Sequence, residues 1–241
     1  MSSTPSLWRR PFLPARILRW PSGKATPASA VYEHPLIVRY CHWLNTIALF
    51  ILAGSGLQIF MAFPSFGPKI PQHDLLHVPP KLALGGWLGG ALQWHITFAW
   101  IYIATGLIYV IYQFASGNYR QFLFTSSDIK GVWPMARFYF FRGEKPPAAE
   151  SYNALQKLAY TFVVLLGILS VWTGLVLYKP VQFSGLAWLL GGFHLARVWH
   201  FAVLWLFVLF VIGHLIMVIL HGWNNFVSMI TGWKRNPDYL P

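Results

Sequence analysis

The sequence predicts an all-α integral membrane protein, a bundle of four transmembrane helices with both termini in the cytoplasm and short interfacial segments in its loops. Of the 241 residues, 56% are hydrophobic and only 10% are charged, whereas about a quarter of the residues in a soluble domain are charged. The mean hydropathy is +0.50. Long uncharged stretches predict the four spans, and the uneven distribution of basic residues predicts their orientation.

Each uncharged stretch is long enough to cross a bilayer. A helix needs about 20 residues to span a hydrocarbon core that is about 30 Å thick. Only helices and closed barrels satisfy their backbone groups there, and continuous apolar stretches of this length favour the helix. The predicted spans are residues 43–63, 95–115, 158–178 and 198–220.

The basic residues predict the orientation of these spans. Fourteen of the eighteen lie before the first span, between the second and third, or after the fourth. Four lie on the other side: Lys69, Lys81, Lys179 and Arg197. Because cytoplasmic loops carry the excess of Lys and Arg, both termini are expected to be cytoplasmic. The net charge of +12 then reflects this bias and contact with anionic membrane lipid, not nucleic-acid binding.

The chain divides into three expected parts. Residues 1–38 form a cytoplasmic arm without the apolar core of a signal peptide, and its residues 8–20 mix arginine with aromatic side chains that suit the membrane surface. Residues 39–233 form the transmembrane domain, and residues 234–241 a cytoplasmic tail. Residues 81–94, 133–142 and 188–192 are expected to be interfacial, surface-lying or re-entrant segments.

Four histidines lie in or at the edge of the spans. Ionisable groups in such segments are functional candidates, and histidine is a common axial ligand of haem iron. The alternative for any single one is a hydrogen bond to a neighbouring helix. The four residues are His42, His95, His200 and His214.

The spacing of these histidines predicts two ligand pairs. His200 and His214 are fourteen residues apart, which places them on one helix face and about 21 Å apart along the axis. His95 and His200 lie at matching depths, about 15 and 13 Å outside the middle of their spans. His42 lies toward the inner side, where depth alone leaves both His214 and His221 as partners.

An arginine precedes two of the histidines by three residues. Arg39 and Arg197 are each about one helical turn nearer the membrane surface than His42 and His200. A guanidinium pairs with carboxylates in a forked geometry, so both are candidates to bind haem propionates. The alternative is the usual extension of interfacial arginines toward water.

The sequence gives little support for a disulfide, an iron–sulfur cluster, a substrate-converting site or a metal site in the loops. The single cysteine, Cys41, excludes an internal disulfide and an iron–sulfur cluster held by cysteines of this chain alone. No nucleophile–base arrangement is visible, so no substrate-converting site is expected apart from a quinone site. His73 and His77 flank Asp74 in a proline-rich loop, where solvent or partner contact is favoured over a metal site. A membrane scaffold or transporter without haem is the remaining class.

These motifs resemble the prokaryotic di-haem cytochrome b family that includes cytochrome b561, Ni,Fe-hydrogenase cytochrome b and formate dehydrogenase gamma subunits. The resemblance covers residues 39 to about 233. It rests on Arg39-Tyr-Cys-His42-Trp, Trp94-His95, Tyr152-Asn153-Ala154-Leu155-Gln156-Lys157, Arg197-Val-Trp-His200-Phe, and His214 followed by Met229-Ile-Thr-Gly232-Trp233. It implies two haem b groups, the outer on His95 and His200 and the inner on His42 and His214.

The resemblance also implies a function and partners. Asn153 and Gln156 would border a quinone pocket beside the inner haem, although the residues alone indicate only a polar helix start. The chain looks most like inner-membrane subunits that accompany periplasmic molybdopterin oxidoreductases of the sulfite-oxidase type. It would then be a membrane anchor that carries electrons between such an enzyme and the quinone pool. The alternative is a stand-alone cytochrome b561-type quinol oxidase of a small acceptor.

Overall fold

The computed structural model describes residues 30–62, 79–141 and 152–235. Four long apolar helices dominate the described part, and each is long enough to cross a membrane. They are α1 (Leu36–Ala62), α2 (Leu88–Ala115), α5 (Ala154–Tyr178) and α7 (Phe193–His221). Their outward faces expose many large apolar side chains, as expected where lipid surrounds the bundle. The predicted four-helix membrane architecture is confirmed.

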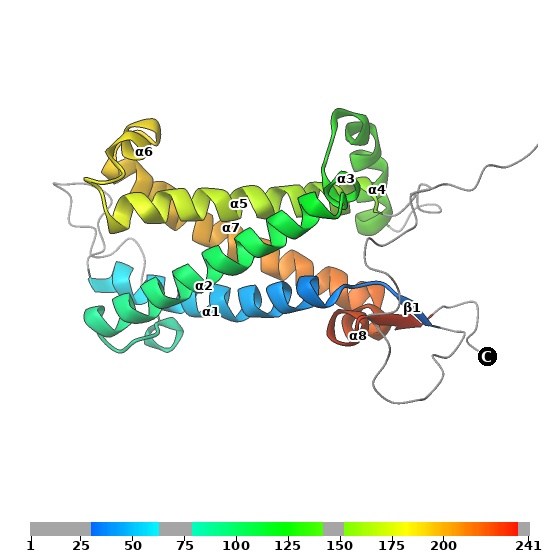
Figure 1. Ribbon diagram of the computed structural model, residues 1–241, viewed down its shortest axis with the longest axis horizontal. Coiled ribbons are helices and arrows are strands. Elements are labelled where there is room, and N and C mark those ends of the chain that lie inside the picture. Colours follow the sequence, from blue (N-terminus) through cyan, green and yellow to red (C-terminus); the bar gives the residue numbers. More distant parts are fainter. Residues whose placement is uncertain (1–29, 63–78, 142–151, 236–241) are drawn as a thin grey trace, which may run out of the picture.

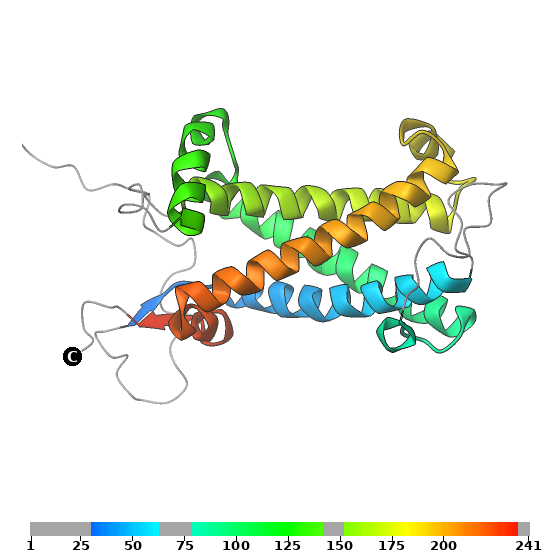
Figure 2. The same cartoon turned by 180° about the vertical axis from the view of Figure 1, so that it is seen from behind.

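The four helices form two packed pairs. Most contacts between long helices are made by α1 with α2 and by α5 with α7. In Figure 1, α1 and α5 run along the two long sides, and α2 crosses obliquely between them. Figure 2, from behind, shows α7 in front, with a slope opposite to that of α2 in the same view. The oblique helices α2 and α7 therefore bring residues from both pairs toward the middle of the bundle.

A small apolar cluster fills the centre of the bundle. Its buried members are Leu166 on α5 and Val203 and Phe207 on α7, with partly buried side chains from α1 and α2 packed against them. Val203 and Phe207 lie between His200 and His214 in the sequence. An apolar layer thus separates the two levels at which the membrane histidines occur.

The helices begin earlier than the charge-free stretches predict, whereas their ends agree to within one residue. Three of them, α1, α5 and α7, take basic residues into their first two turns. The Arg39 side chain reaches the carbonyl of Ile230, and the Lys157 ammonium reaches Asp128, so these cations are accommodated at the helix ends. A search for charge-free windows therefore shortens these three helices at their beginnings.

Short elements occupy the two ends of the bundle (Figure 1). One end carries α3 (Tyr119–Phe122), α4 (Ile129–Phe141), α8 (Trp223–Thr231) and an antiparallel ribbon of β1 (Ala30–Tyr32) with β2 (Trp233–Arg235). Between α3 and α4 lies the 3-10 turn η2 (Ser126–Asp128). The other end carries α6 (Ser184–Leu189). Both ends of the described chain therefore lie on the same side of the bundle.

The segment before α2 folds back along α1. The 3-10 turn η1 (Pro80–Leu82) leads to Leu84, whose N–H donates to the carbonyl of Gly54 at 3.0 Å. Gly54 lies eight residues before the end of α1. The expected interfacial or re-entrant segment, residues 81–94, is thus divided between this stretch beside α1 and the first residues of α2, which begins at Leu88. Residues 8–20, His73 and His77 lie outside the described residues.

Candidate functional site

The structure brings the four membrane histidines together as two pairs. The ring centres of His95 on α2 and His200 on α7 are 6.1 Å apart. Those of His42 on α1 and His214 on α7 are also 6.1 Å apart. We call the first the outer pair and the second the inner pair, after the depths predicted from the sequence. Each pair joins one helix of the α1–α2 unit to α7.

This separation fits one metal ion between two imidazoles. With metal–nitrogen bonds of about 2 Å and each nitrogen about 1 Å from its ring centre, the two centres lie about 6 Å apart. No group of three or more His, Cys, Asp or Glu residues is placed to hold a metal within the described ranges. Two protein ligands at each site suit haem iron, whose macrocycle supplies the remaining equatorial ligands.

Hydroxyl groups contact both rings of the outer pair. Ser55 Oγ on α1 lies 3.0 Å from Nδ1 of His95, and Thr173 Oγ1 on α5 lies 2.9 Å from Nδ1 of His200. Both hydroxyl residues are completely buried. Neither residue is predicted from the sequence as a contact of the histidines. The tripeptides Ser55-Gly56-Leu57 and Thr173-Gly174-Leu175 were the available signal.

The glycines that follow these hydroxyls leave room for the imidazoles. A Cβ atom on Gly56 would lie 3.3 Å from Cε1 of His95, and one on Gly174 would lie 3.4 Å from Cε1 of His200. A longer side chain at either position would have to displace the ring. Both rings are therefore seated by the same arrangement, a hydroxyl residue followed by glycine, on α1 and on α5.

The inner pair has different surroundings. Nδ1 of His42 is buried and has no hydrogen-bond partner in the described part of the chain. The His214 ring stacks on Phe210 with centres 5.9 Å apart, and it is exposed on the surface of the protein alone. His214 is thus the α7 histidine that the structure places beside His42. His221 is the last residue of α7, and the structure does not describe its side chain.

The two arginines lie one turn from histidines, as expected. Nη1 of Arg39 donates to the carbonyl of Ile230 at 2.5 Å, which joins α1 to α8. Nε of Arg39 is buried and lacks a partner among the residues described, so it fits an acceptor such as a carboxylate. Arg197 is half-buried in the second turn of α7.

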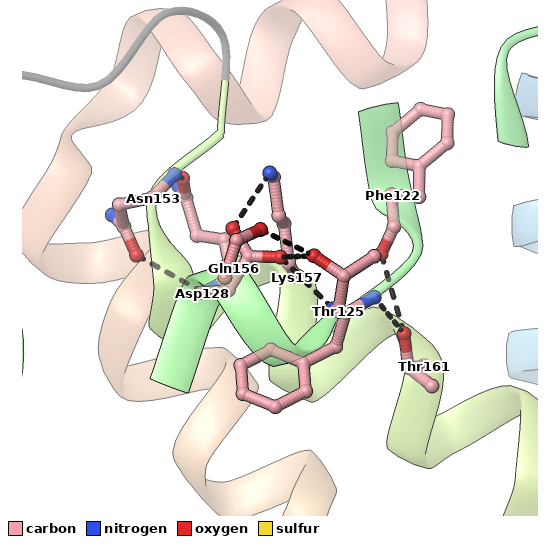
Figure 3. A network of polar contacts seen from close by, with 9 residues as sticks. Phe122, Thr125, Asp128, Asn153, Gln156, Lys157 and Thr161 are labelled. Carbon is pink, nitrogen blue, oxygen red and sulfur yellow. Dashed lines mark hydrogen bonds and ion pairs between the residues drawn. The ribbon is translucent and has the colours of Figure 1, made fainter. Parts of the chain in front are cut away.

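Asn153 and Gln156 form the cap at the start of α5 (Figure 3). Oδ1 of Asn153 accepts from the Gln156 N–H, and Oε1 of Gln156 accepts from the Asn153 N–H, both at 3.0 Å. This reciprocal capping satisfies two N–H groups that the helix leaves unpaired. Nδ2 of Asn153 also donates to the Tyr139 hydroxyl on α4. The two residues predicted to border a quinone site therefore have a structural role in the described part of the chain: they cap the start of α5.

An ion pair next to this cap fastens the segment between α3 and α4 (Figure 3). Nζ of Lys157 lies 2.8 Å from Oδ1 of Asp128. The Asp128 carboxylate also accepts hydrogen bonds from the hydroxyl and N–H of Thr125. The hydrogen bond from Lys157, followed by those from Thr125, lowers the pKa of Asp128 to about 2.

Comparison with known proteins agrees with the geometry. Residues 33–232 match the sequence model of the family described as prokaryotic cytochrome b561. An Azospira oryzae protein named putative protein-methionine-sulfoxide reductase subunit YedZ1 is 39% identical over 200 residues, which is 83% of this chain and 96% of that relative.

More distant relatives carry hydrogenase names. A probable Ni/Fe-hydrogenase B-type cytochrome subunit of Cupriavidus necator is 28% identical over 238 residues, 90% of this chain and 91% of the relative. A probable Ni/Fe-hydrogenase 1 B-type cytochrome subunit of Escherichia coli is 25% identical over 205 residues, 78% and 81% of the two chains. The family implies haem b and a multi-pass location in the bacterial inner membrane. The chain therefore belongs to the prokaryotic cytochrome b561 family and is a cytochrome b-type membrane electron-transfer subunit of a redox enzyme.

Proposed function

We propose that the chain binds two haem b groups, one at each histidine pair, and carries electrons between a periplasmic oxidoreductase and the membrane quinone pool. Bound haem supplies reversible one-electron transfer. The residues of the chain ligate it, exclude water from it and adjust its surroundings. One observation carries the proposal: two histidine pairs with the same 6.1 Å ring separation occur at different levels of one bundle.

The level of each pair supports two separate cofactors. His200 and His214 are fourteen residues apart on α7, or about 21 Å along the helix axis. The apolar cluster that contains Val203 and Phe207 lies between them. With one haem on each side of this apolar layer, electrons can pass from one level of the bundle to the other. A single haem would serve only one level.

The partner is proposed from the relatives and from the charge distribution. The Azospira oryzae relative is named as a subunit of a putative protein-methionine-sulfoxide reductase. The excess of Lys and Arg at the end with α3, α4 and the ribbon favours that end as cytoplasmic. The outer pair then faces the periplasm, where we place a molybdopterin-containing oxidoreductase.

We place the quinone site at the inner-pair end, bordered by Asn153 and Gln156. Their capping role has to be separated from contact with a quinone. Gln156→Glu keeps the side-chain oxygen that accepts from the Asn153 N–H, because Glu serves as well as Gln in a capping box. It removes the amide donor that a quinone carbonyl would accept. Slower reduction by quinol with unchanged thermal stability supports the quinone role.

The test is purification in mild detergent followed by spectroscopy and identification of bound proteins. We expect a reduced-minus-oxidised cytochrome b spectrum, reduction by a quinol analogue, and a soluble oxidoreductase that co-purifies. A preparation with haem that lacks a partner and transfers electrons from quinol to a small acceptor would instead establish the stand-alone function. A preparation without a cytochrome spectrum would refute the proposal.

A further inference from the structure

The outer pair has a hydrogen-bonding shell that the cytochrome assignment does not account for. Ser55 and Thr173 come from two different helices, α1 and α5, and each places a buried hydroxyl oxygen on Nδ1 of a ligand histidine. The rings themselves project from α2 and α7, so each hydroxyl is supplied by a helix other than the one that carries its histidine.

The direction of both hydrogen bonds follows from the other contacts of the hydroxyls. Ser55 Oγ donates its hydrogen to the carbonyl of Ile51 at 2.6 Å. Thr173 Oγ1 donates to the carbonyl of Leu169 at 2.7 Å. A hydroxyl has one hydrogen to donate, so each oxygen must accept from the imidazole. Nδ1 of each histidine therefore carries the proton.

Backbone carbonyls are further acceptors beside these rings, Leu52 for His95 and Ser170 for His200. A neutral imidazole carries one N–H, and the hydroxyl contacts assign it to Nδ1. With Nδ1 protonated, Nε2 keeps its lone pair and is the nitrogen available to a metal.

Hydroxyl groups of other helical residues also donate to the backbone of their own helix. Such bonds do not explain why Ser55 and Thr173 also contact a histidine ring on another helix. Thr46 Oγ1 donates to the carbonyl of His42, and Thr231 Oγ1 to that of Val227. At Ser55 and Thr173 the hydroxyl hydrogen is used in the bond to the backbone carbonyl. The hydroxyl oxygen is then free to accept a hydrogen bond from a histidine ring.

We infer that Ser55 and Thr173 are positioning residues that hold His95 and His200 in the Nδ1–H tautomer and lower the redox potential of the haem at the outer pair. The inference rests on the proposed binding of haem at this pair. An acceptor on Nδ1–H raises the basicity of the coordinating nitrogen. A more basic ligand donates more electron density and favours the ferric state.

The test compares two substitutions at one position in the purified membrane protein. Thr173→Val keeps the shape and removes the hydroxyl, whereas Thr173→Ser keeps the hydroxyl and removes the methyl group. Thr46→Val removes a hydroxyl whose hydrogen bond, among the residues described, stays within its own helix, and Ser55→Ala tests the other ring. Each variant is titrated against potential, with the inner haem as an internal reference.

We expect Thr173→Val and Ser55→Ala to raise the potential of the outer haem, each by about a tenfold change in the ferrous-to-ferric ratio, which is about 59 mV. Thr173→Ser and Thr46→Val should leave it unchanged. Loss of outer haem in Thr173→Val alone would also support the inference, because only that variant at Thr173 lacks the acceptor.

Equal potentials in Thr173→Val and Thr173→Ser, with haem retained, would overturn the inference and leave the proposed function intact. Equal haem loss in the two variants would overturn it as well, because packing would then be the cause. Unmodified protein without haem would refute the proposed function and the inference together.

Discussion

The outer and inner histidine pairs have equal ring separations and opposite surroundings. Both rings of the outer pair are held at Nδ1 by buried hydroxyls, and glycines beside these hydroxyls leave the rings room. At the inner pair, Nδ1 of His42 and Nε of Arg39 are buried without partners in the described ranges. The described residues therefore provide hydrogen-bond partners for both rings of the outer pair. At the inner pair, the same described residues leave these two nitrogens of His42 and Arg39 without partners.

This difference shows how each end depends on its cofactor. A buried polar group without a partner costs about 1–3 kcal/mol, so the inner pair is the less stable of the two before haem binds. A haem propionate is an acceptor that would pair with a guanidinium such as Arg39. Haem binding should thus order the inner end more than the outer end.

The largest expected effect comes from removing one ligand of either pair. His200→Ala should lose only the outer haem and His214→Ala only the inner haem, because each removes one of two axial ligands. Haem content per chain should fall by half in each case. His221→Ala is the control and should keep the full content. If His221→Ala lost haem and His214→Ala retained it, the inner pair would have been assigned to the wrong residue.

Filling the space beside one outer ring is the next strongest change. A Cβ at Gly56 already lies 3.3 Å from the His95 ring, so Gly56→Leu should displace the imidazole and reduce outer haem binding. Gly106→Leu is the matched control on α2, because nothing lies within 4 Å of a Cβ there. Optical spectra of both variants should show the inner haem unchanged. Full outer occupancy in Gly56→Leu would mean that the glycine is not required.

The sequence predicts the candidate ligands better than their surroundings. Hydropathy and helical spacing are enough to select His42, His95 and His200, because depth along a span can be calculated from residue number. Family resemblance was needed to choose His214 over His221. Ser55 and Thr173 escaped prediction because a buried hydroxyl is ordinary in a membrane helix. Their role appears only when helix rotation brings them to a ring on another helix.

At the inner end, the sequence motif predicts a functional site, whereas the structure shows a structural role for the same residues. The motif at Asn153 and Gln156 predicted a quinone pocket through resemblance, and its simplest physical interpretation, a helix cap, is present in the structure. The early starts of α1 and α5 were missed because Arg39 and Lys157 were treated as loop residues. Tertiary partners at Ile230 and Asp128 make these cations compatible with helix starts, and no local pattern contains those partners.

A moderate effect is expected from the arginine of the inner pair. Arg39→Ala removes the hydrogen bond to the carbonyl of Ile230, and a hydrogen bond of a charged group is worth about 1.5–3 kcal/mol. We expect weaker docking of α8 and reduced inner haem content, measured by thermal unfolding and by spectra. Arg120→Ala, at the same end on the surface, is the control. Equal effects of the two substitutions would argue against a specific role of Arg39.

The smallest effect is expected at the ion pair of Asp128. Its pKa is lowered to about 2 by Lys157 and Thr125, so the carboxylate stabilises the fold above its ordinary pKa near 4. That contribution is lost as the pH falls toward 2. Asp128→Asn should slightly lower the unfolding temperature at neutral pH and leave both haems in place. The difference from unmodified protein should vanish in strong acid, and a difference that grows there would contradict this assignment.

The number of haem groups in the unmodified protein tests the central claim most directly. Quantitative haem extraction, combined with the protein concentration and a low-temperature spectrum, gives both the ratio and the ligation. Two histidine pairs predict two haem b groups per chain, each with two imidazole ligands and separately titrating potentials. A ratio of one, or a centre with a single imidazole, would contradict the account.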